Sequence, residues 1–525
     1  MRYQIDQVFR CGIAFCCVIL AVGCTESRQP PNIVLILADD LGYGDVGAYN
    51  PESKIPTPHI DTLASEGIRF IDAHSPSSVC TPTRYGVLTG RYAWRTPLKT
   101  MGLYEWDRPL IQEDRLTMPH LLRSKGYRTA CIGKWHLGWD WPLKPGTVLD
   151  LPNLGNGFMH RTEQANAIDF TEPIRGGPVD RGFDLYFGDD VANFPPYAFI
   201  ENDSLLAQPT ALPQGRWHGR PGPMVPGWDF HRVMPQITRR AVRFIEQQTP
   251  ETRFFLYFSL TAPHYPIVPL PRFRGVSDAG RYGDFVHEVD WSVGEILEAL
   301  RRRGLEEDTL VLFTSDNGAT GNGAFAKPRS LAERTGHRAN GQWRGVKGDI
   351  WEGGHRVPLI ARWPGRIPEG EISSQLVGLN DLFATVAEIV DFRVPRGAGE
   401  DSTSFLPLLF EEPDPPGLRT ELVLHSSRGA FALRSGNWKL IPGELGSGGR
   451  SPPIRRRPRR GEPRGQLYDL RADPTETRNL YYAHADEAEA MRARLLEIIG
   501  YEPMRLRRGR GGRRELPAEG LGLNG

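Results

Sequence analysis

Four short runs of β-branched and apolar residues constrain the fold of this chain most strongly. They are "NIVLILADD", "YRTACIGKW", "RFFLYFSLTAPH" and "DTLVLFTSDNG", at 32–40, 127–135, 253–264 and 308–318. Such continuous apolar runs are typical of parallel strands that are buried on both faces. Helical patterns lie between them, at 59–70, 237–248 and 285–304. The alternation predicts an α/β fold with a large mixed, mostly parallel sheet flanked by helices.

The pattern changes near residue 420. "ELVLHSS" and "AFALRSGNWKLI" predict antiparallel strands with a Gly-Asn turn, and "DEAEAMRARLLEIIG" predicts a final helix. We therefore expect a large domain over 30–420 and a smaller C-terminal α+β subdomain over 421–500, with an antiparallel sheet. In the large domain, the helical pattern at 59–70 places four apolar side chains on one face. They are Ile60, Leu63, Ala64 and Ile68.

The charge of the chain gives no general argument for nucleic-acid binding, because the net charge is only +1. Two arginine-rich runs stand out, "RRRPRRGEPR" at 455–464 and "RLRRGRGGRR" at 505–514. Both are rich in Gly or Pro and lack apolar periodicity, which favours a solvated loop and a basic, disordered tail over 501–525. Contact with a polyanion or a membrane surface is the alternative for both runs.

The first 24 residues have the pattern of an export signal. Two arginines in "MRYQIDQVFR" precede the short apolar run "CGIAFCCVILAVGC", which is too short for a permanent membrane span. The ending "AVGC" resembles a bacterial lipoprotein cleavage site, with Cys24 as the lipidated residue; an ordinary signal peptide is the alternative. Either reading predicts export, to the periplasm or the cell surface, and the first adds a lipid anchor in the membrane.

The chain has six cysteines, and four of them fall in this export signal. Only Cys80 and Cys131 remain, so the chain is not a disulfide scaffold. A Cys80–Cys131 disulfide is one possibility in an oxidising compartment. The residues around Cys80 favour a different role, as the motifs below indicate.

Polar side chains follow all four predicted strands. Open α/β sheets bind ligands outside the carboxyl ends of their strands, so these residues predict a site. Two pairs of oxygen donors among them favour Ca²⁺ or Mg²⁺ over zinc, although Asp and Asn also cap turns. The oxygen donors are Asp39, Asp40, Asp316 and Asn317.

A second group at the same edge consists of cationic and proton-transferring side chains. Together they suit a cluster of anionic substrate oxygens and a proton transfer to a leaving group. Any single lysine among them could instead be a solvated surface residue. The group comprises Arg84, Lys134, His136, His264 and Lys347.

"CTPTR" at 80–84 resembles the sulfatase signature, in which a cysteine in a Cys-X-Pro-X-Arg setting is oxidised to formylglycine. Further segments are similar to that family, in its order: "NIVLILADDLGYGDVGAY", "PTRYGVLTGRY", "GKWHLG", "APHYP", "TSDNG", "GVKGDIWEGGHRVPLI" and "LYDLRADPTETRNL". The resemblance runs from about residue 32 to 500, so 30–420 is expected to be the catalytic domain. His355 departs from the usual pattern, and we expect no effect on the chemistry.

The resemblance implies a reaction. A formylglycine-generating or maturase enzyme would convert Cys80, and one hydroxyl of the hydrated aldehyde would attack sulfur while the other helps to expel sulfate. One Ca²⁺ ion would be bound by Asp39, Asp40, Asp316 and Asn317, with an oxygen of the modified Cys80. Arg84 would hold the hydrate, and Lys134, Lys347 and His264 would contact the sulfate. His264 would protonate the leaving alcohol and His136 would take the proton during elimination.

The expected substrate is a sulfated polysaccharide or oligosaccharide. Aromatic faces suit sugar rings, and Phe194, Tyr197 and Phe199 lie in an irregular region expected to carry binding loops. Packing of these three rings in a core is an equal alternative. Two other functions remain possible: hydrolysis of phosphate or phosphonate esters within the same superfamily, and non-catalytic binding of sulfated glycans.

Overall fold

The computed structural model describes residues 30–149, 162–213, 219–320, 331–410 and 416–500. The predicted export signal with Cys24 and the basic tail over 501–525 lie outside these residues, so both stay predictions, as do the expected domain boundaries. Among the described helices, none has the length and apolar character that a membrane span requires.

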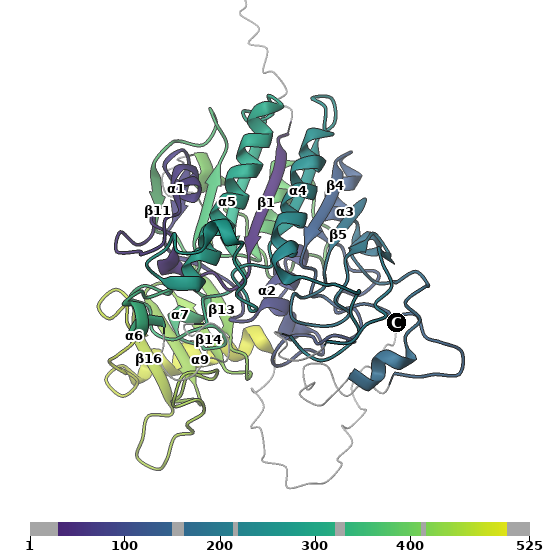
Figure 1. The fold of residues 1–525 in the computed structure, drawn as a ribbon. Helices are drawn as coiled ribbons and strands as arrows, with labels where there is room; N and C mark the ends of the chain where they lie inside the picture. The colour runs from purple at the N-terminus through teal and green to yellow at the C-terminus, as the bar shows by residue number, and fades with distance from the viewer. Residues whose placement is uncertain (1–29, 150–161, 214–218, 321–330, 411–415, 501–525) are drawn as a thin grey trace, which may run out of the picture. The chain divides into compact units, whose positions relative to one another are not determined.

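A ten-stranded sheet forms the centre of the unit that begins at Pro31 (Figure 1). The strand order is β11-β2-β10-β9-β1-β8-β4-β5-β6-β7. The five central strands, from β9 to β5, are parallel, and antiparallel pairs occur toward both edges. The predicted mixed sheet is thereby confirmed. Its strands are β1 (Asn32–Ala38), β2 (Ile68–Phe70), β4 (Arg128–Gly133), β5 (Leu185–Gly188), β6 (Ile200–Glu201), β7 (Ser204–Leu205), β8 (Phe254–Ser259), β9 (Thr309–Ser315), β10 (Leu359–Arg362) and β11 (Glu371–Ser373).

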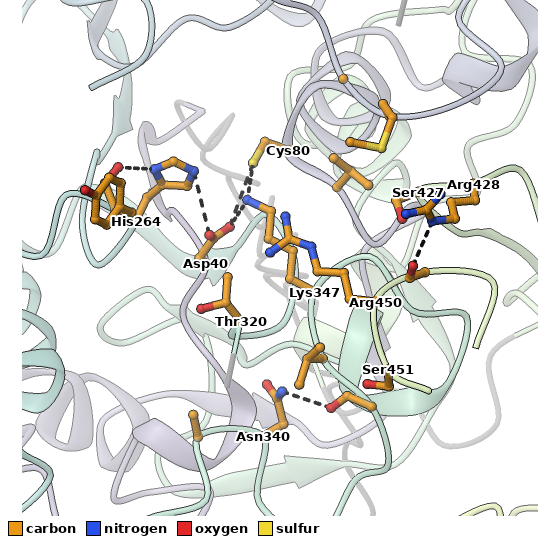
Figure 2. Close-up of a pocket in the computed structure, with 18 of the residues that line it drawn as sticks. Asp40, Cys80, His264, Thr320, Asn340, Lys347, Ser427, Arg428, Arg450 and Ser451 are labelled. Carbon is orange, nitrogen blue, oxygen red and sulfur yellow. Dashed lines mark hydrogen bonds and ion pairs between the residues drawn. The ribbon is translucent and has the colours of Figure 1, made fainter. Parts of the chain in front are cut away.

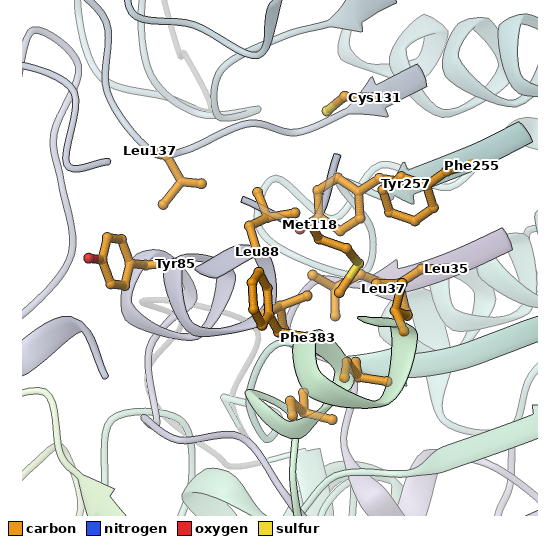
Figure 3. Close-up of a cluster of buried hydrophobic side chains, with 14 of the residues drawn as sticks. Leu35, Leu37, Tyr85, Leu88, Met118, Cys131, Leu137, Phe255, Tyr257 and Phe383 are labelled. Carbon is orange, nitrogen blue, oxygen red and sulfur yellow. The ribbon is translucent and has the colours of Figure 1, made fainter. Parts of the chain in front are cut away.

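Helices cover both faces of this sheet. Alternate residues of β1 point to opposite sides, so Leu35 packs with Leu88, Met118 and Phe383 (Figure 3), while Ile36 belongs to the other core layer. The first layer is covered by α2 (Cys80–Thr89), α3 (Met118–Ser124) and α8 (Asp381–Ile389), and the second by α1 (Pro58–Ser65), α4 (Val233–Glu246) and α5 (Gly280–Arg302). Two short helices, α6 (Leu331–Thr335) and α7 (Glu352–His355), lie in the loops between β9 and β10.

The helix predicted over 59–70 is wrong beyond its first two turns. The helix α1 ends at Ser65, and Ile68 lies in strand β2, where it pairs with Ala361 of β10. Gly67 is the physical reason, because a Cβ there would lie 2.3 Å from the Ala361 carbonyl oxygen. The close approach of two backbones requires glycine, so the chain leaves the helix and enters the sheet.

A separate four-stranded antiparallel sheet has the order β13-β14-β15-β16. Its strands are β13 (Glu421–His425), β14 (Phe431–Ser435), β15 (Trp438–Pro442) and β16 (Gly465–Asp469). The predicted Gly-Asn turn joins β14 to β15, and Gly436 adopts the positive φ of 52° that this tight turn needs. Helix α9 (Ala485–Ile499) packs on β14 and β15. The predicted antiparallel sheet and final helix are confirmed. A two-residue pair, β3 (Ala73–His74) with β12 (Val377–Gly378), completes the strands.

A buried ionic network connects this second sheet to helix α7. Lys439 of β15 lies with its Nζ 3.0 Å from Glu352 Oε1 and 2.8 Å from Glu476 Oε1, and all three side chains are fully buried. His355, the departure from the family pattern, belongs here too: its Nε2 lies 3.1 Å from Lys439 Nζ and its Nδ1 lies 3.0 Å from His74 Nδ1. The expectation that His355 leaves the chemistry unchanged stays a prediction.

We expect Lys439→Met to lower the free energy of unfolding by about 3–5 kcal/mol, because it leaves the carboxylates of Glu352 and Glu476 buried beside an apolar side chain. The measurement is urea-induced unfolding followed by circular dichroism. Lys144→Met is the matched control, since Lys144 is exposed and its Nζ donates to the Asn166 carbonyl oxygen; it should change the stability by less than about 0.5 kcal/mol. Equal stability of the two variants would contradict the network's structural role.

Candidate active site

Every residue predicted for the site lies at one edge of the large sheet. Because β1, β4, β8 and β9 are adjacent and parallel, the loops after their carboxyl ends meet. Asp39 and Asp40 follow β1, Lys134 and His136 follow β4, and His264 follows β8. Asp316 and Asn317 follow β9, Cys80 and Arg84 belong to α2, and Lys347 precedes α7.

Two of these residues have an unusual backbone. Asp40 and His136 adopt positive φ values of 67° and 54°, a region that non-glycine residues rarely occupy. Asp316 accepts a hydrogen bond from the Asp40 backbone N at 3.1 Å, and Asp190 accepts one from the His136 backbone N at 3.0 Å. Each strained residue is therefore held by a buried carboxylate, as is common where a side chain must be aimed into a functional site.

Three carboxylates and a thiol converge at the centre of the edge. The ligand atoms of Asp39, Asp40, Cys80 and Asp316 all lie within 4.8 Å of one another, and all four residues are buried. Cys80 Sγ is 3.5 Å from Asp39 Oδ1 and 3.8 Å from Asp40 Oδ1. Burial and the neighbouring Asp316 raise the pKa of the Cys80 thiol to about 12. The unmodified thiol is therefore protonated and a weak nucleophile at neutral pH.

Each carboxylate of this cluster has a close cationic partner, and Asp39 Oδ1 also lies 3.6 Å from Arg84 Nη2. Arg84 donates from Nε and Nη2 to Asp316 Oδ2 at 3.0 and 2.7 Å, and Lys134 Nζ lies 2.8 Å from Asp39 Oδ2. Lys347 bonds to Asp40 and lies 3.0 Å from Cys80 Sγ (Figure 2). Burial opposes the positive charge of Lys347, but Asp40, Cys80 and Asp39 together outweigh it and the pKa of Lys347 is raised.

The oxygen donors of the cluster fit a hard divalent cation. Asn317 donates from Nδ2 to Asp40 Oδ1 at 2.8 Å and to the Gly318 carbonyl at 3.0 Å, which fixes the orientation of its amide. Its Oδ1 is buried and has no hydrogen-bond partner in the described part of the chain. A buried acceptor without a donor beside three carboxylates is the arrangement that Ca²⁺ or Mg²⁺ satisfies.

The two histidines are neutral in this arrangement. His136 places Nε2 3.0 Å from the Leu103 carbonyl, so that nitrogen carries the proton, and its Nδ1 is buried without a partner among the described residues. Burial and Lys134 hold the pKa of His136 well below its usual range. His264 donates from Nδ1 to the Tyr265 carbonyl at 2.6 Å, and its Nε2 lies 3.8 Å from Asp40 Oδ2. Burial lowers the pKa of His264 to about 3.

The Cys80–Cys131 disulfide that the sequence left open is not formed. Both cysteines are free and buried, with Cys80 at the start of α2 and Cys131 inside β4. Cys131 belongs to the apolar core layer that contains Leu35 and Met118 (Figure 3). Cys80 is thus part of the polar cluster and Cys131 part of the core, so substitutions of the two can be compared in an experiment.

A cavity of about 1450 Å³ opens at this cluster. Cys80, His136, His264 and Lys347 line it, and Phe194 lies on its wall. The other two aromatic side chains expected there do not line it. Tyr197 donates to the carbonyls of Asn193 and Arg220 and packs on Phe230, and Phe199 stacks on Phe187. The core-packing alternative therefore holds for Tyr197 and Phe199, and the cavity-lining expectation holds for Phe194.

Sequence reasoning missed a second acidic pair near the site. Asp189 and Asp190 follow β5, and burial raises their pKa values to about 7 and about 6. Asp190 fixes the His136 backbone, while both carboxylate oxygens of Asp189 are buried without a partner among the described residues. Two acidic residues after a buried parallel strand are the same pattern that predicted Asp39 and Asp40 as site residues. Strand β5 is only four residues long, so its apolar run is too short to be recognised in the sequence.

Comparison with known proteins agrees with this geometry. The Sulfatase family profile matches residues 31–392. An N-acetylgalactosamine-6-O-sulfatase of Bacteroides thetaiotaomicron is 32% identical over 92% of this chain and 97% of its own. Human arylsulfatase A is 32% identical over 88% and 85%. A solved structure from work on glycosaminoglycan metabolism by Bacteroides thetaiotaomicron superposes with a TM-score of 0.75 at 28% identity, covering 90% of this chain and 100% of its own.

The chain therefore belongs to the sulfatase family. It is a sulfuric ester hydrolase, an enzyme that cleaves sulfate esters with water. The family implies a formylglycine and a metal ion, and the buried cluster of Asp39, Asp40, Cys80 and Asp316 lies where both would act.

We expect Asn317→Ala to weaken calcium binding about tenfold or more, because it removes a predicted ligand oxygen that has no hydrogen-bond partner among the described residues, while leaving the three carboxylates in place. The measurement is calorimetric titration of chelator-treated protein with CaCl₂. Asn166→Ala, at an exposed position, is the matched control and should bind calcium as the wild type does. An unchanged calcium affinity in a folded Asn317→Ala variant would contradict the assignment of this ligand.

Proposed function

We propose that this sulfatase acts on carbohydrates and removes sulfate from a sulfated poly- or oligosaccharide, with 6-O-sulfated N-acetylgalactosamine as the first candidate. The cavity carries this proposal. Its volume of about 1450 Å³ far exceeds that of a sulfate group, and the aromatic side chains of Tyr104 and Phe194 line it, a residue type that suits sugar rings. The names of the relatives support the candidate sugar: the Bacteroides enzyme and a human relative, 32% identical over 74% of this chain and 68% of its own, both act on N-acetylgalactosamine 6-sulfate by name.

The nucleophile in this proposal is Cys80 after conversion to formylglycine by a generating or maturase enzyme. Two observations support it: "CTPTR" begins helix α2, and the side chain of Cys80 lies between the carboxylates and Lys347 at the base of the cavity. The hydrated aldehyde would supply a hydroxyl for attack on sulfur, which a protonated thiol does not offer.

A calcium ion completes the proposed site. Asp39, Asp40, Asp316 and Asn317 would hold it together with an oxygen of residue 80. When bound, the ion would orient the nucleophile and offset negative charge that develops on the sulfate oxygens. The choice of calcium rests on the four oxygen donors. It also rests on the absence of a histidine from the buried group of Asp39, Asp40, Cys80 and Asp316.

The remaining residues bind the sulfate and move protons. Lys134 and Lys347 are fixed by Asp39 and Asp40, so their ammonium groups need no reorganisation when a sulfate arrives. Arg84, held bidentately by Asp316, would orient the hydrate of residue 80. His136 presents an unprotonated Nδ1 that can accept a proton during sulfate elimination.

His264 is proposed as the acid that protonates the leaving alcohol. Its Nδ1 hydrogen is engaged by the Tyr265 carbonyl, so the proton to be donated must be on Nε2, which faces Asp40. In the free enzyme burial disfavours that proton. A bound sulfate anion beside the ring favours the charged imidazolium, so substrate binding itself would promote protonation of His264 at Nε2.

The test of the nucleophile is mass spectrometry of the protein co-produced with a formylglycine-generating enzyme. The peptide with Cys80 should be about 18 Da lighter than the cysteine form, whereas the peptide with Cys131 should be unchanged. Cys80→Ala should abolish turnover of sulfate esters, because no nucleophile remains. Cys131→Ala, at a core position, is the matched control and should keep the specific activity of its folded fraction. An unmodified Cys80 in a fully active enzyme would overturn the proposal.

The test of the substrate class compares kcat/KM across a panel of sulfated mono- and oligosaccharides, an aryl sulfate and an aryl phosphonate monoester. A sulfated sugar should exceed the aryl sulfate by about tenfold or more, because ring contacts away from sulfur can be used to lower the barrier. Among the sulfated monosaccharides, N-acetylgalactosamine 6-sulfate should rank first. Preference for the phosphonate, or no turnover of any sulfated sugar, would contradict the proposed carbohydrate sulfatase activity.

A further inference from the structure

The cavity is much more cationic than the removal of one sulfate requires. Among the described residues that line it, Asp40 is the one carboxylate, and it belongs to the catalytic cluster. Six lysine and arginine side chains face it along the walls. They are Arg220, Arg338, Lys347, Arg428, Arg450 and Arg455.

Two of these six cations already have a charged partner. Lys347 is paired with Asp40. Arg220 is paired with Glu105, with Nη1 3.1 Å from Oε2, and its guanidinium lies 4.6 Å from the ring centroids of both Tyr104 and Phe194. Lys347 is already assigned to the sulfate that is cleaved, and the contacts of Arg220 build the wall.

Three other cations gather on the wall formed by the second sheet and have no carboxylate partner among the described residues. Arg428 follows β13, and Arg450 and Arg455 lie in the long connection between β15 and β16, the one that contains the arginine-rich run 455–464. All three side chains are exposed. Their contacts are with backbone oxygens: Arg428 Nε donates to the Gly449 carbonyl at 3.0 Å, and Arg455 donates to the Arg428 carbonyl. We call these three residues the arginine wall.

The arginine wall is held close to the catalytic centre. Asp349, two residues after Lys347, accepts hydrogen bonds from the backbone N of Arg450 at 2.5 Å and of Ser451 at 3.0 Å. Ser427 Oγ donates to the Gly348 carbonyl at 3.0 Å. Figure 2 shows the Arg450 guanidinium beside Lys347, with no dashed contact to any group. The same loop thus positions the predicted sulfate ligand and the arginine next to it.

Arg455 bonds to the Arg428 backbone and Arg450 lines the same wall, so the positive charges of the arginine wall repel one another. Burial lowers the pKa of Arg455, and the neighbouring Arg428 lowers it further, against the opposing effect of Glu444. An anion between them would relieve this repulsion, and guanidinium groups bind carboxylates and sulfates through paired N–H donors.

We propose that Arg428, Arg450 and Arg455 bind a second anionic group of the substrate, either a carboxylate or a further sulfate, on the sugar unit next to the one that loses sulfate. The enzyme then prefers polyanionic glycans over singly sulfated ones. This inference rests on the proposed carbohydrate sulfatase activity, and it gives a function to Arg455, one residue of the arginine-rich run 455–464.

The experiment compares kcat/KM for four substrates built on the singly sulfated monosaccharide that the wild type hydrolyses best. They are that monosaccharide, its disaccharide with a hexuronic acid, the same disaccharide with the carboxylate reduced to an alcohol, and a disaccharide with a second sulfate in place of the carboxylate. The wild type should prefer at least one of the two disaccharides with a second anion about tenfold over the reduced one. Which of the two is preferred identifies the bound group.

Arg428→Gln and Arg450→Gln should each lower that preference about fivefold or more while leaving kcat/KM for the monosaccharide within about twofold, because a charged hydrogen bond to the second anion is lost. Arg460→Gln is the matched control: it lies exposed in the same connection, does not line the cavity, and should leave the preference unchanged. Unchanged melting temperatures confirm folding.

Three results would overturn the inference. One is a wild type that hydrolyses the reduced disaccharide as well as both anionic ones. Another is an Arg450→Gln variant that loses activity equally on every substrate, which would assign Arg450 to the scissile sulfate. The third is an Arg460→Gln variant that loses the preference as strongly as the other two, which would indicate a general charge effect. Failure to hydrolyse any sulfated sugar would instead contradict the proposed function itself.

Discussion

Three carboxylates and three cations are buried together at the carboxyl edge of the large sheet, and the site depends on the ion pairs between them. Asp39 is paired with Lys134, Asp40 with Lys347 and Asp316 with Arg84. Removing an ion from water costs several kcal/mol, and an unpaired buried charge would destabilise the fold strongly. The pairs also fix the positions of the ammonium and guanidinium groups, so the groups proposed to bind sulfate are set before any substrate enters.

The sheet makes this pairing possible because it brings distant parts of the chain to one edge. Arg84 and Asp316 are 232 positions apart, and Lys347 and Asp40 are 307 apart. The cluster as it stands is close to neutral, so a divalent cation would add an excess of positive charge and a sulfate ester would offset part of it. On the proposed account, the metal and the substrate therefore strengthen each other's binding.

Much of the architecture could be predicted from residue pattern alone. The four strand runs are long, apolar and followed by polar residues, and this pattern predicts that Asp39, Lys134 and Asp316 lie at one edge of the sheet. The helix predicted over 59–70 is wrong in its last part because of Gly67. Glycine is needed there because the carbonyl of Ala361, far along the chain, lies against it. The apolar periodicity of a short sequence segment contains no information about such a distant contact.

Other features depend on tertiary structure and could not be read from the sequence. Tyr197 and Phe199 lie in the same aromatic segment of the sequence as Phe194. Tyr197 packs on Phe230 and Phe199 on Phe187, so of the three only Phe194 lines the cavity. The sequence likewise showed an arginine-rich loop but not its neighbours. Only the fold shows that Arg450 reaches the loop of Lys347, through the Asp349 carboxylate.

The most direct test of the account is a crystal structure of the converted enzyme grown with calcium and soaked with a sulfated sugar, recorded with anomalous data. The account predicts one anomalous peak among Asp39, Asp40, Asp316 and Asn317, with the sulfate of the ligand beside residue 80 and within hydrogen-bonding distance of Lys134 and Lys347. An ordered sulfated sugar bound elsewhere in the cavity, with the carboxylates still paired only to Lys134, Lys347 and Arg84, would contradict it.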